Sequence, residues 1–324
     1  MVKHRLTVVA LGGNALVRAG ESGTLDQQRA HIEESVAPIA RIAAEGRPLI
    51  VTHGNGPIVG QLMLQGELAR AEVPLMPLHI MDAESQGSVG FLLQQAISNH
   101  LFAAGVGREV VTVVTRVVVD PADASFGDPT KPVGRFYEEA EARALADERG
   151  WVVAEDSGRG WRRRVASPLP LRIPEARVIG GLARRGVVVI AAGGGGVPVV
   201  QRADGSLEGV DAVVDKDRAS AVLGLQAGAA RMLILTSVDA VYRDFATPQR
   251  ARLASLAVEE AERLLAEGQF AAGSMRPKIE AALAFMRGGG ADVLIGLPEE
   301  ADAVLAGRCG TRVFDRVSTE SVRS

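Results

Sequence analysis

The sequence predicts an α/β protein in which helices cover both faces of a sheet. Six short runs rich in Val, Ile and Leu alternate along the chain with segments of helical periodicity. These runs are apolar at both alternating positions, as in strands that are buried on both sides. Strands separated by helical segments are typical of a mainly parallel sheet.

The boundaries follow from the runs themselves. The expected strands are residues 6–11, 48–52, 109–115, 187–192, 231–237 and 291–296. The expected helices are residues 25–45, 57–70, 85–104, 175–185, 216–228, 256–267 and 275–287. The uncharged stretch 85–107 contains Gln, Asn and His and has one apolar face, so it predicts a buried or amphipathic helix and not a membrane span.

Two regions interrupt this alternation. Residues 120–168 are rich in Pro, Gly and charge and hold both tryptophans, which indicates a subdomain inserted on the main sheet. Residues 197–215 predict a hairpin around the tetrapeptide "ADGS".

The composition excludes several classes of protein. The 324 residues are 47% hydrophobic and 23% charged, which is ordinary for a soluble globular protein. Aromatic residues are only 4% and the net charge is −3, so nucleic acid is not an expected partner. The single Cys309 excludes an internal disulfide, and the first apolar run, which ends at Gly12, is too short for a secretory signal. We therefore expect a cytoplasmic protein with no membrane segment.

Glycine-rich loops follow three of the expected strands. They are Gly12, Gly13 and Asn14, then Gly54, Asn55 and Gly56, then Gly193 through Gly196. Ligands of open α/β sheets bind beyond the carboxyl ends of the strands, and free backbone N–H groups there attract anions. Three such loops predict a polyanionic ligand such as a nucleoside triphosphate.

Other nucleotide and hydrolase motifs are missing. The sequence has no G-x-x-x-x-G-K-[ST] and no G-x-S-x-G, and "HGNGPIVG" only approaches a dinucleotide fingerprint. The five histidines lack metal-ligand spacing. His53 borders a glycine loop and either contacts a ligand or is structural.

Lysine is scarce and sits in unusual contexts. Only four of the 36 Lys and Arg residues are lysine, and three of them are Lys131, Lys216 and Lys278. Lysine is a compact point charge, which suits a site where phosphoryl oxygens move. Lys216 lies between Asp215 and Asp217, a pattern that fits either a phosphoryl-transfer site or a surface charge run. In the first case Asp217 would orient the lysines, and Asp215 would do the same or help to hold Mg²⁺.

The chain resembles the carbamate kinases of the amino acid kinase superfamily over nearly its whole length. The matching segments are "ALGGNAL", "VTHGNGPIVG", "QGSVGF", "VVVDPAD", "PTKPVG", "EDSGRGWRRRVASP", "GGGGVPVV", "VDAVVDKDRAS" and "AGSMRPKIEAA". The resemblance implies a three-layer αβα sandwich with an open, mainly parallel eight-stranded sheet and a small protruding subdomain. It implies an N-terminal lobe over about 1–185, a C-terminal lobe over about 186–316 and a flexible tail at 317–324.

The resemblance also implies an activity. It is the reversible transfer of a phosphoryl group between ATP plus carbamate and ADP plus carbamoyl phosphate, with Mg²⁺, in a homodimer. The direction implied is ATP synthesis in arginine or purine-derived catabolism. Two alternatives remain: a related enzyme with another small carboxylate or phosphonate acceptor, and a non-catalytic nucleotide-binding regulatory module.

The site residues implied by the family fall into three groups. The catalytic residues are Lys131, Lys216, Asp217 and Lys278. The substrate and phosphoryl residues are Gly12, Gly13, Asn14, Gly54 and Asn55. The nucleotide residues are Gly194, Gly195, Asp215, Thr236, Val238, Tyr242, Met275 and Lys278. No protein ligand is assigned to the metal, which is expected mainly on the nucleotide phosphates. Glu84, Ser237 and Ala246 depart from the family pattern and bear on the acceptor and the nucleotide.

Overall fold

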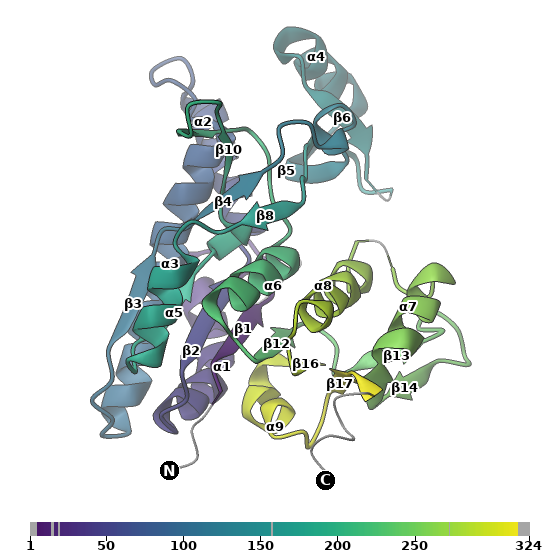
Figure 1. Ribbon diagram of the computed structural model, residues 1–324. Coiled ribbons are helices and arrows are strands. Elements are labelled where there is room, and N and C mark those ends of the chain that lie inside the picture. The colour runs from purple at the N-terminus through teal and green to yellow at the C-terminus, as the bar shows by residue number, and fades with distance from the viewer. Residues whose placement is uncertain (1–4, 14–15, 19, 157, 272, 317–324) are drawn as a thin grey trace.

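An eight-stranded sheet is the centre of the computed structural model, which describes residues 5–13, 16–18, 20–156, 158–271 and 273–316 (Figure 1). The strand order is β15-β17-β16-β12-β1-β2-β9-β3. The described neighbours pair in parallel except β16 with β17. The strands are β1 (Thr7–Leu11), β2 (Leu49–His53), β3 (Val110–Val113), β9 (Val188–Ala191), β12 (Arg231–Leu235), β15 (Ser255–Ala257), β16 (Asp292–Gly296) and β17 (Thr311–Phe314).

The six expected strands all belong to this sheet, and the eight-stranded, mainly parallel fold is confirmed. The strands β15 and β17 were not expected from the sequence. They are three and four residues long, and Arg312 interrupts the apolar run of β17. Such short segments pair only because β16 and the helices beside it provide an edge to join.

Helices cover both faces, and the strands send alternate side chains to each. Val9, Leu49 and Val51 point into one core with helices α1, α3 and α9, and their neighbours Val8 and Ile50 point into the other with α5, α6, α7 and α8. The helices are α1 (Leu25–Ala44), α3 (Leu78–Ala103), α5 (Ala176–Arg184), α6 (Lys216–Ala227), α7 (Val258–Ala266), α8 (Met275–Arg287) and α9 (Ala301–Leu305). None of the described helices is long and apolar enough to cross a membrane.

The helix that was expected to begin at residue 85 starts earlier. Helix α3 begins at Leu78, directly after Pro77, and its N-cap makes no side-chain hydrogen bond. The sequence therefore lacks the Ser, Thr or Asp cap that would have marked this start. The added first turns include Met81 and Asp82, both buried.

A second, four-stranded sheet carries the expected hairpin. Its order is β11-β10-β4-β8, and β10 pairs antiparallel with β11 around a turn at 202–206 in which Gly205 has φ +87°. Its strands are β4 (Arg116–Val119), β8 (Pro170–Arg172), β10 (Val197–Gln201) and β11 (Leu207–Gly209). A separate two-stranded ribbon joins β13 (Val241–Arg243) and β14 (Ala251–Leu253).

A small three-stranded sheet stands apart from the main sheet in Figure 1. It has the order β5-β7-β6 and carries one helix; the elements are β5 (Lys131–Tyr137), α4 (Glu139–Arg149), β6 (Val152–Glu155) and β7 (Trp161–Val165). Val133 and Val165 pack on Val59 and Met63 of helix α2 (Gly56–Ala69). This contact places Lys131 above the main sheet. The proposed lobe boundaries stay predictions, and the expected tail lies outside the described residues.

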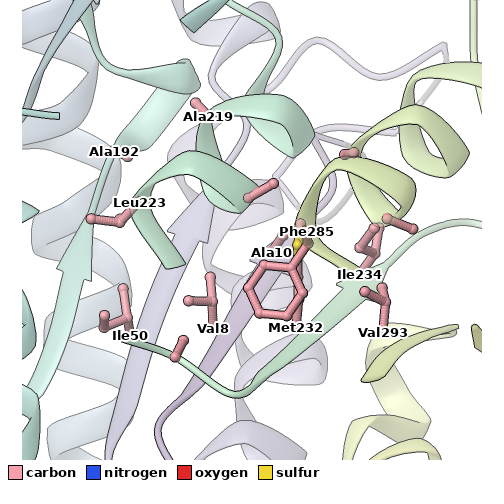
Figure 2. Packing of buried hydrophobic residues seen from close by; sticks show 14 of the residues in the cluster. Val8, Ala10, Ile50, Ala192, Ala219, Leu223, Met232, Ile234, Phe285 and Val293 are labelled. Atoms are coloured by element: carbon pink, nitrogen blue, oxygen red, sulfur yellow. The ribbon is translucent and has the colours of Figure 1, made fainter. Parts of the chain in front are cut away.

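The core on the α6 and α8 face is tightly packed around one ring. Phe285 of α8 is fully buried, and Figure 2 shows it among Val8, Ala10, Met232 and Ile234. A Cβ added to Gly224 of α6 would lie 2.9 Å from Phe285 Cε2, so the glycine permits the close approach of the two helices.

Replacing this ring should destabilise the fold. Phe285→Ala should lower the free energy of unfolding by about 3–5 kcal/mol, because it leaves a cavity between α6, α8 and the sheet. The matched control is Phe102→Ala at a side chain that is 87% exposed, which should change stability by less than about 0.5 kcal/mol. Urea unfolding compares the two; equal effects would contradict this account of the core.

Candidate active site

The glycine loops meet at one edge of the main sheet. Strands β1, β2 and β9 are parallel neighbours, so the loops that follow them lie together. A Cβ added to Gly54 would lie 2.9 Å from Gly13 Cα, and one added to Gly194, where φ is +67°, would lie 2.0 Å from Asn55 Nδ2. Only glycine leaves room for these close contacts. Asn14 lies outside the described residues.

Asn55 is locked beneath these loops. Its Nδ2 group donates to Asp82 Oδ1 at 3.1 Å and to Ser85 Oγ at 2.7 Å, and all three residues are buried. The Ser85 hydroxyl donates its own proton to the carbonyl of Asp82 at 2.7 Å, so it can only accept from Asn55. This fixes the orientation of the Asn55 amide.

His53 is structural. It is buried, and its Nδ1 donates to the carbonyl of Gly54 at 2.9 Å. Burial lowers the pKa of His53 to about 4 against the opposing effect of that hydrogen bond, so the ring is neutral at pH 7. The ring also fills the space where a Cβ of residue 193 would lie, 2.4 Å from Nε2.

Helix α6 begins at the expected lysine. The carboxylate of Asp215 caps the helix by accepting from the N–H groups of Asp217 at 3.0 Å and Arg218 at 3.2 Å. The cap holds Lys216 in the first turn, where the N-terminal end of the helix dipole favours anions.

Asp217 joins the two helices that carry lysines. Lys216 Nζ donates to Asp217 Oδ1 at 2.5 Å, and Lys278 Nζ of α8 donates to Asp217 Oδ2 at 2.9 Å. The side chain of Asp217 is only 3% exposed, and those of the lysines are 13% exposed. The structure thus brings three of the expected catalytic residues into one ion cluster.

Burial and charge act against each other in this cluster. Burial would raise the pKa of Asp217, but Lys216 and Lys278 outweigh it and hold that pKa below its ordinary value. Burial lowers the pKa of Lys216, and Asp217 opposes this effect. The carboxylate is therefore ionised, and the cluster presents cations to any anion that enters.

A cavity lies above this cluster. We call it the lysine cavity; its wall contains Gly13, Gly54, Asn55, Val59, Asp82, Lys131, Val133, Arg162, Gly194, Val213, Asp215, Lys216, Asp217, Ser274 and Lys278. Lys131 reaches it from β5, is 43% exposed, and has Nζ 3.7 Å from Asp215 Oδ2. The small three-stranded sheet therefore closes one side of the cavity.

Two further hollows continue from the lysine cavity. The middle hollow shares Gly13, Lys216, Ser274 and Lys278 with it and also contains Gly12 and Thr236. The third, the aromatic hollow, is lined by Thr236, Ser237, Val238, Ala240, Tyr242, Phe245, Gln269, Phe270, Ala271, Ser274 and Met275. Together they form a path from an apolar hollow, past the lysines, to a polar cavity.

The expected nucleotide residues do not all lie in one hollow. Thr236, Val238, Tyr242 and Met275 line the aromatic hollow, whereas Gly194, Asp215 and Lys278 line the lysine cavity. Gly195 is buried, where an added Cβ would lie only 2.2 Å from the Val214 carbonyl oxygen. Three residues depart from the family pattern. Ser237 lines the aromatic hollow, while Glu84 and Ala246 are exposed and lie outside all three hollows.

Two charged residues of the lysine cavity, Asp82 and Arg162, were not predicted from the sequence. Arg162 of β7 lies in the segment "EDSGRGWRRRVASP", which predicts no role for it. Its Nη2 donates to the carbonyl of Gly134 at 2.9 Å. Asp82 lies just before the expected helix 85–104, in a segment that also carries Glu84. Nothing in the sequence marks one of these two carboxylates as the one that faces a cavity.

The acidic side chains of the cavity do not form a metal-binding cluster. Within the part of the chain that the structure describes, no three His, Cys, Asp or Glu side chains gather as they would around a metal ion. Asp215 and Asp217 lie in the cavity wall but are engaged by N–H groups and lysines.

A comparison with models of protein families decides which family this fold belongs to. Residues 5–296 match the model described as the amino acid kinase family. The chain belongs to the amino acid kinase family. The match spans seven of the eight strands of the main sheet, the small three-stranded sheet and both lysine-bearing helices, and only β17 of that sheet lies beyond it.

Individual relatives are carbamate kinases. The enzyme of Pyrococcus horikoshii is 44% identical over 308 residues, covering 94% of this chain and 98% of that protein. The enzyme of Halobacterium salinarum is 47% identical over 311 residues, covering 95% and 97%. A structure of carbamate kinase from Giardia lamblia bound to AMP-PNP has a TM-score of 0.90 and 41% identity, covering 97% of this chain and all of that one. The resemblance expected from the sequence is confirmed.

Removing the carboxylate of Asp217 should destabilise the protein. Asp217→Asn leaves two buried ammonium groups without their counter-ion and should cost about 3–5 kcal/mol of stability at pH 7. Because the pKa of Asp217 is lowered in the folded protein, its contribution is present above the unfolded value of 3.8 and is lost as pH falls through the folded value. The difference between wild type and variant should therefore shrink only in strong acid. Urea unfolding measures it, with the exposed Asp147→Asn of α4 as control.

Proposed function

We propose that the protein is a carbamate kinase, which transfers a phosphoryl group reversibly between ATP and carbamate and so exchanges them for ADP and carbamoyl phosphate. The observation that carries the proposal is the cluster of Lys216, Asp217 and Lys278 at the junction of an apolar hollow and a polar cavity. End-to-end similarity to carbamate kinases supports it.

The nucleotide would lie along the path of the three hollows. Its adenine would occupy the aromatic hollow beside Tyr242 and Met275, as an apolar hollow suits a base. The phosphates would then pass Ser274 and Gly13 toward the lysines. Helices α6 and α8 both begin at this point, so their N-terminal dipoles favour the phosphates.

Carbamate would occupy the lysine cavity. One of its carboxylate oxygens attacks the γ-phosphorus of ATP, forming one P–O bond while the bond to the β-phosphate oxygen breaks. Charge is spread over the moving group in such a step, and catalysis consists mainly of positioning and charge stabilisation. Lys216 and Lys278 would stabilise this charge from below, and Lys131 would approach from β5.

Asp217 would keep the two lysines side by side. Without it, two ammonium groups at such close range would repel each other or lose a proton, since burial already lowers the pKa of Lys216. The carboxylate therefore acts as a positioning group.

A magnesium ion fits this arrangement. Mg²⁺ is commonly held by substrate phosphates with one or two carboxylates, and it would neutralise phosphate charge here. Asp215, in the wall of the lysine cavity, would supply an oxygen. The homodimer and a role in ATP synthesis during arginine or purine-derived catabolism stay predictions.

The first test is turnover by the purified protein. With ADP, Mg²⁺ and carbamoyl phosphate it should form ATP, and with acetyl phosphate as donor it should form far less. No ATP from carbamoyl phosphate, with ADP still bound, would overturn the proposed function and favour another acceptor or a regulatory role.

The catalytic role of Lys216 is tested by a substitution that keeps its positive charge. Lys216→Arg should lower kcat by about 10²–10³-fold, because the wide guanidinium cannot replace a compact ammonium at 2.5 Å from a buried carboxylate. The matched control is Arg276→Lys on the exposed side of α8, which should stay within about threefold. ADP affinity of both variants is measured by calorimetry. A Lys216→Arg variant with nearly normal kcat would remove Lys216 from the mechanism.

A further inference from the structure

Asp82 is a carboxyl group without a cation in a cavity full of cations. It lies in the wall of the lysine cavity, is 3% exposed, and has no ion pair among the described residues. The other two carboxylates of that wall are both engaged. Asp217 contacts two lysines, and Asp215 caps α6 and lies 3.7 Å from Lys131.

The cations around the cavity have other partners. Lys131 faces Asp215, Lys216 and Lys278 face Asp217, and Arg162 donates to Asp156 Oδ2 at 3.2 Å and to the carbonyl of Gly134. The charged group that acts on Asp82 is Asp211, another acid. The wall of the cavity also includes Val59, Val133 and Val213, which cannot stabilise a negative charge.

The hydrogen bonds of Asp82 settle which oxygen is free. Oδ1 accepts from Asn55 Nδ2, whose orientation is fixed by Ser85. Oδ2 has no hydrogen-bond partner within the described residues and belongs to a side chain of the cavity wall. The carboxyl is therefore held by one oxygen and offers the other.

Burial raises the pKa of Asp82 to about 8; the Asn55 hydrogen bond opposes this, and Asp211 adds to it. The group is thus mainly a neutral carboxylic acid at pH 7. A carboxylic acid kept neutral by apolar surroundings can donate a hydrogen bond to an oxyanion.

We propose that Asp82 is an acceptor-binding residue, whose protonated Oδ2 donates a hydrogen bond to the carboxylate oxygen of the acceptor that does not receive the phosphoryl group. The inference rests on the proposed function. In carbamoyl phosphate this oxygen is a carbonyl; when the P–O bond breaks it shares the negative charge of the released carboxylate. A donor aimed at it therefore binds the transition state more strongly than the ground state.

Substitution of Asp82 separates the effect of its hydrogen-bond donor from the effect of its charge. An ionised Asp82 would repel an anionic acceptor, so activity should fall as pH rises through about 8. Asp82→Asn keeps an N–H donor at the same place and cannot ionise, so it should lose this alkaline fall while retaining kcat/KM within about fivefold. Asp82→Ala should lose on the order of tenfold to hundredfold in kcat/KM, as expected for a hydrogen bond to a charged group.

The experiment compares wild type, both variants and Glu84→Gln in ATP formation from ADP and carbamoyl phosphate between pH 6.5 and 9. Glu84 is a carboxylate two residues further along α3 that is exposed and outside the cavity, so its variant should follow the wild-type profile. An Asp82→Asn variant as impaired as Asp82→Ala would overturn the proposal, because the site would then need a carboxylate. Normal activity of Asp82→Ala would also overturn it.

A second readout does not depend on turnover. An acid that is neutral only when folded destabilises the protein increasingly as pH rises from about 4, its unfolded value, to about 8. Asp82→Asn should therefore have a Tm advantage that grows over this range and then stays constant. The infrared band of a protonated carboxyl should be present at pH 7 and absent in the variant. A wild-type protein without turnover would refute the function and the acceptor contact, while these two measurements would still decide the protonation of Asp82.

Discussion

The buried carboxylate of Asp217 is the contact around which the candidate site is built. It holds the ammonium groups of Lys216 and Lys278, the second of which comes from a helix 61 positions away in the chain. Removing charge from water is costly, and this cost is offset only because both oxygens are paired. The same contact therefore joins α6 to α8 and holds two cations where the hollows meet.

The site also depends on the main sheet, which brings the glycine loops together beside the lysines. Parallel neighbours β1, β2 and β9 end at one edge, and the glycine loops after them pack so closely that a single Cβ would intrude. This leaves little side-chain bulk beside the lysines. The small three-stranded sheet, resting on α2, then brings Lys131 and Arg162 over the opening. A site for transfer between two anions needs such convergent positive charge on a rigid frame.

The carboxyl groups of the lysine cavity differ in whether a cation pairs with them. Asp217 stays ionised because of two lysines, whereas burial drives Asp82 toward the neutral form against the opposing hydrogen bond from Asn55. Two aspartates in one cavity thus acquire opposite protonation states from their surroundings. The first organises cations, and the second is suited to donate a hydrogen bond to an anionic acceptor.

Local chemistry was readable in the chain itself. The alternation of apolar runs predicted the sheet, and the three glycine loops predicted the edge where the site lies. The scarcity of lysine in an arginine-rich sequence pointed to Lys131, Lys216 and Lys278. These signals depend only on residue type and short spacing. The position of Asp82 could not be read in this way. Successive helical residues differ by about 100°, so Asp82 and Glu84 point about 200° apart, and only the packing of α3 against α2 and the sheet decides which of them faces the cavity. Likewise, β15 and β17 are too short to be strands without a neighbour, and Gly194 lies beside Asn55 because of long-range contacts that no local pattern records.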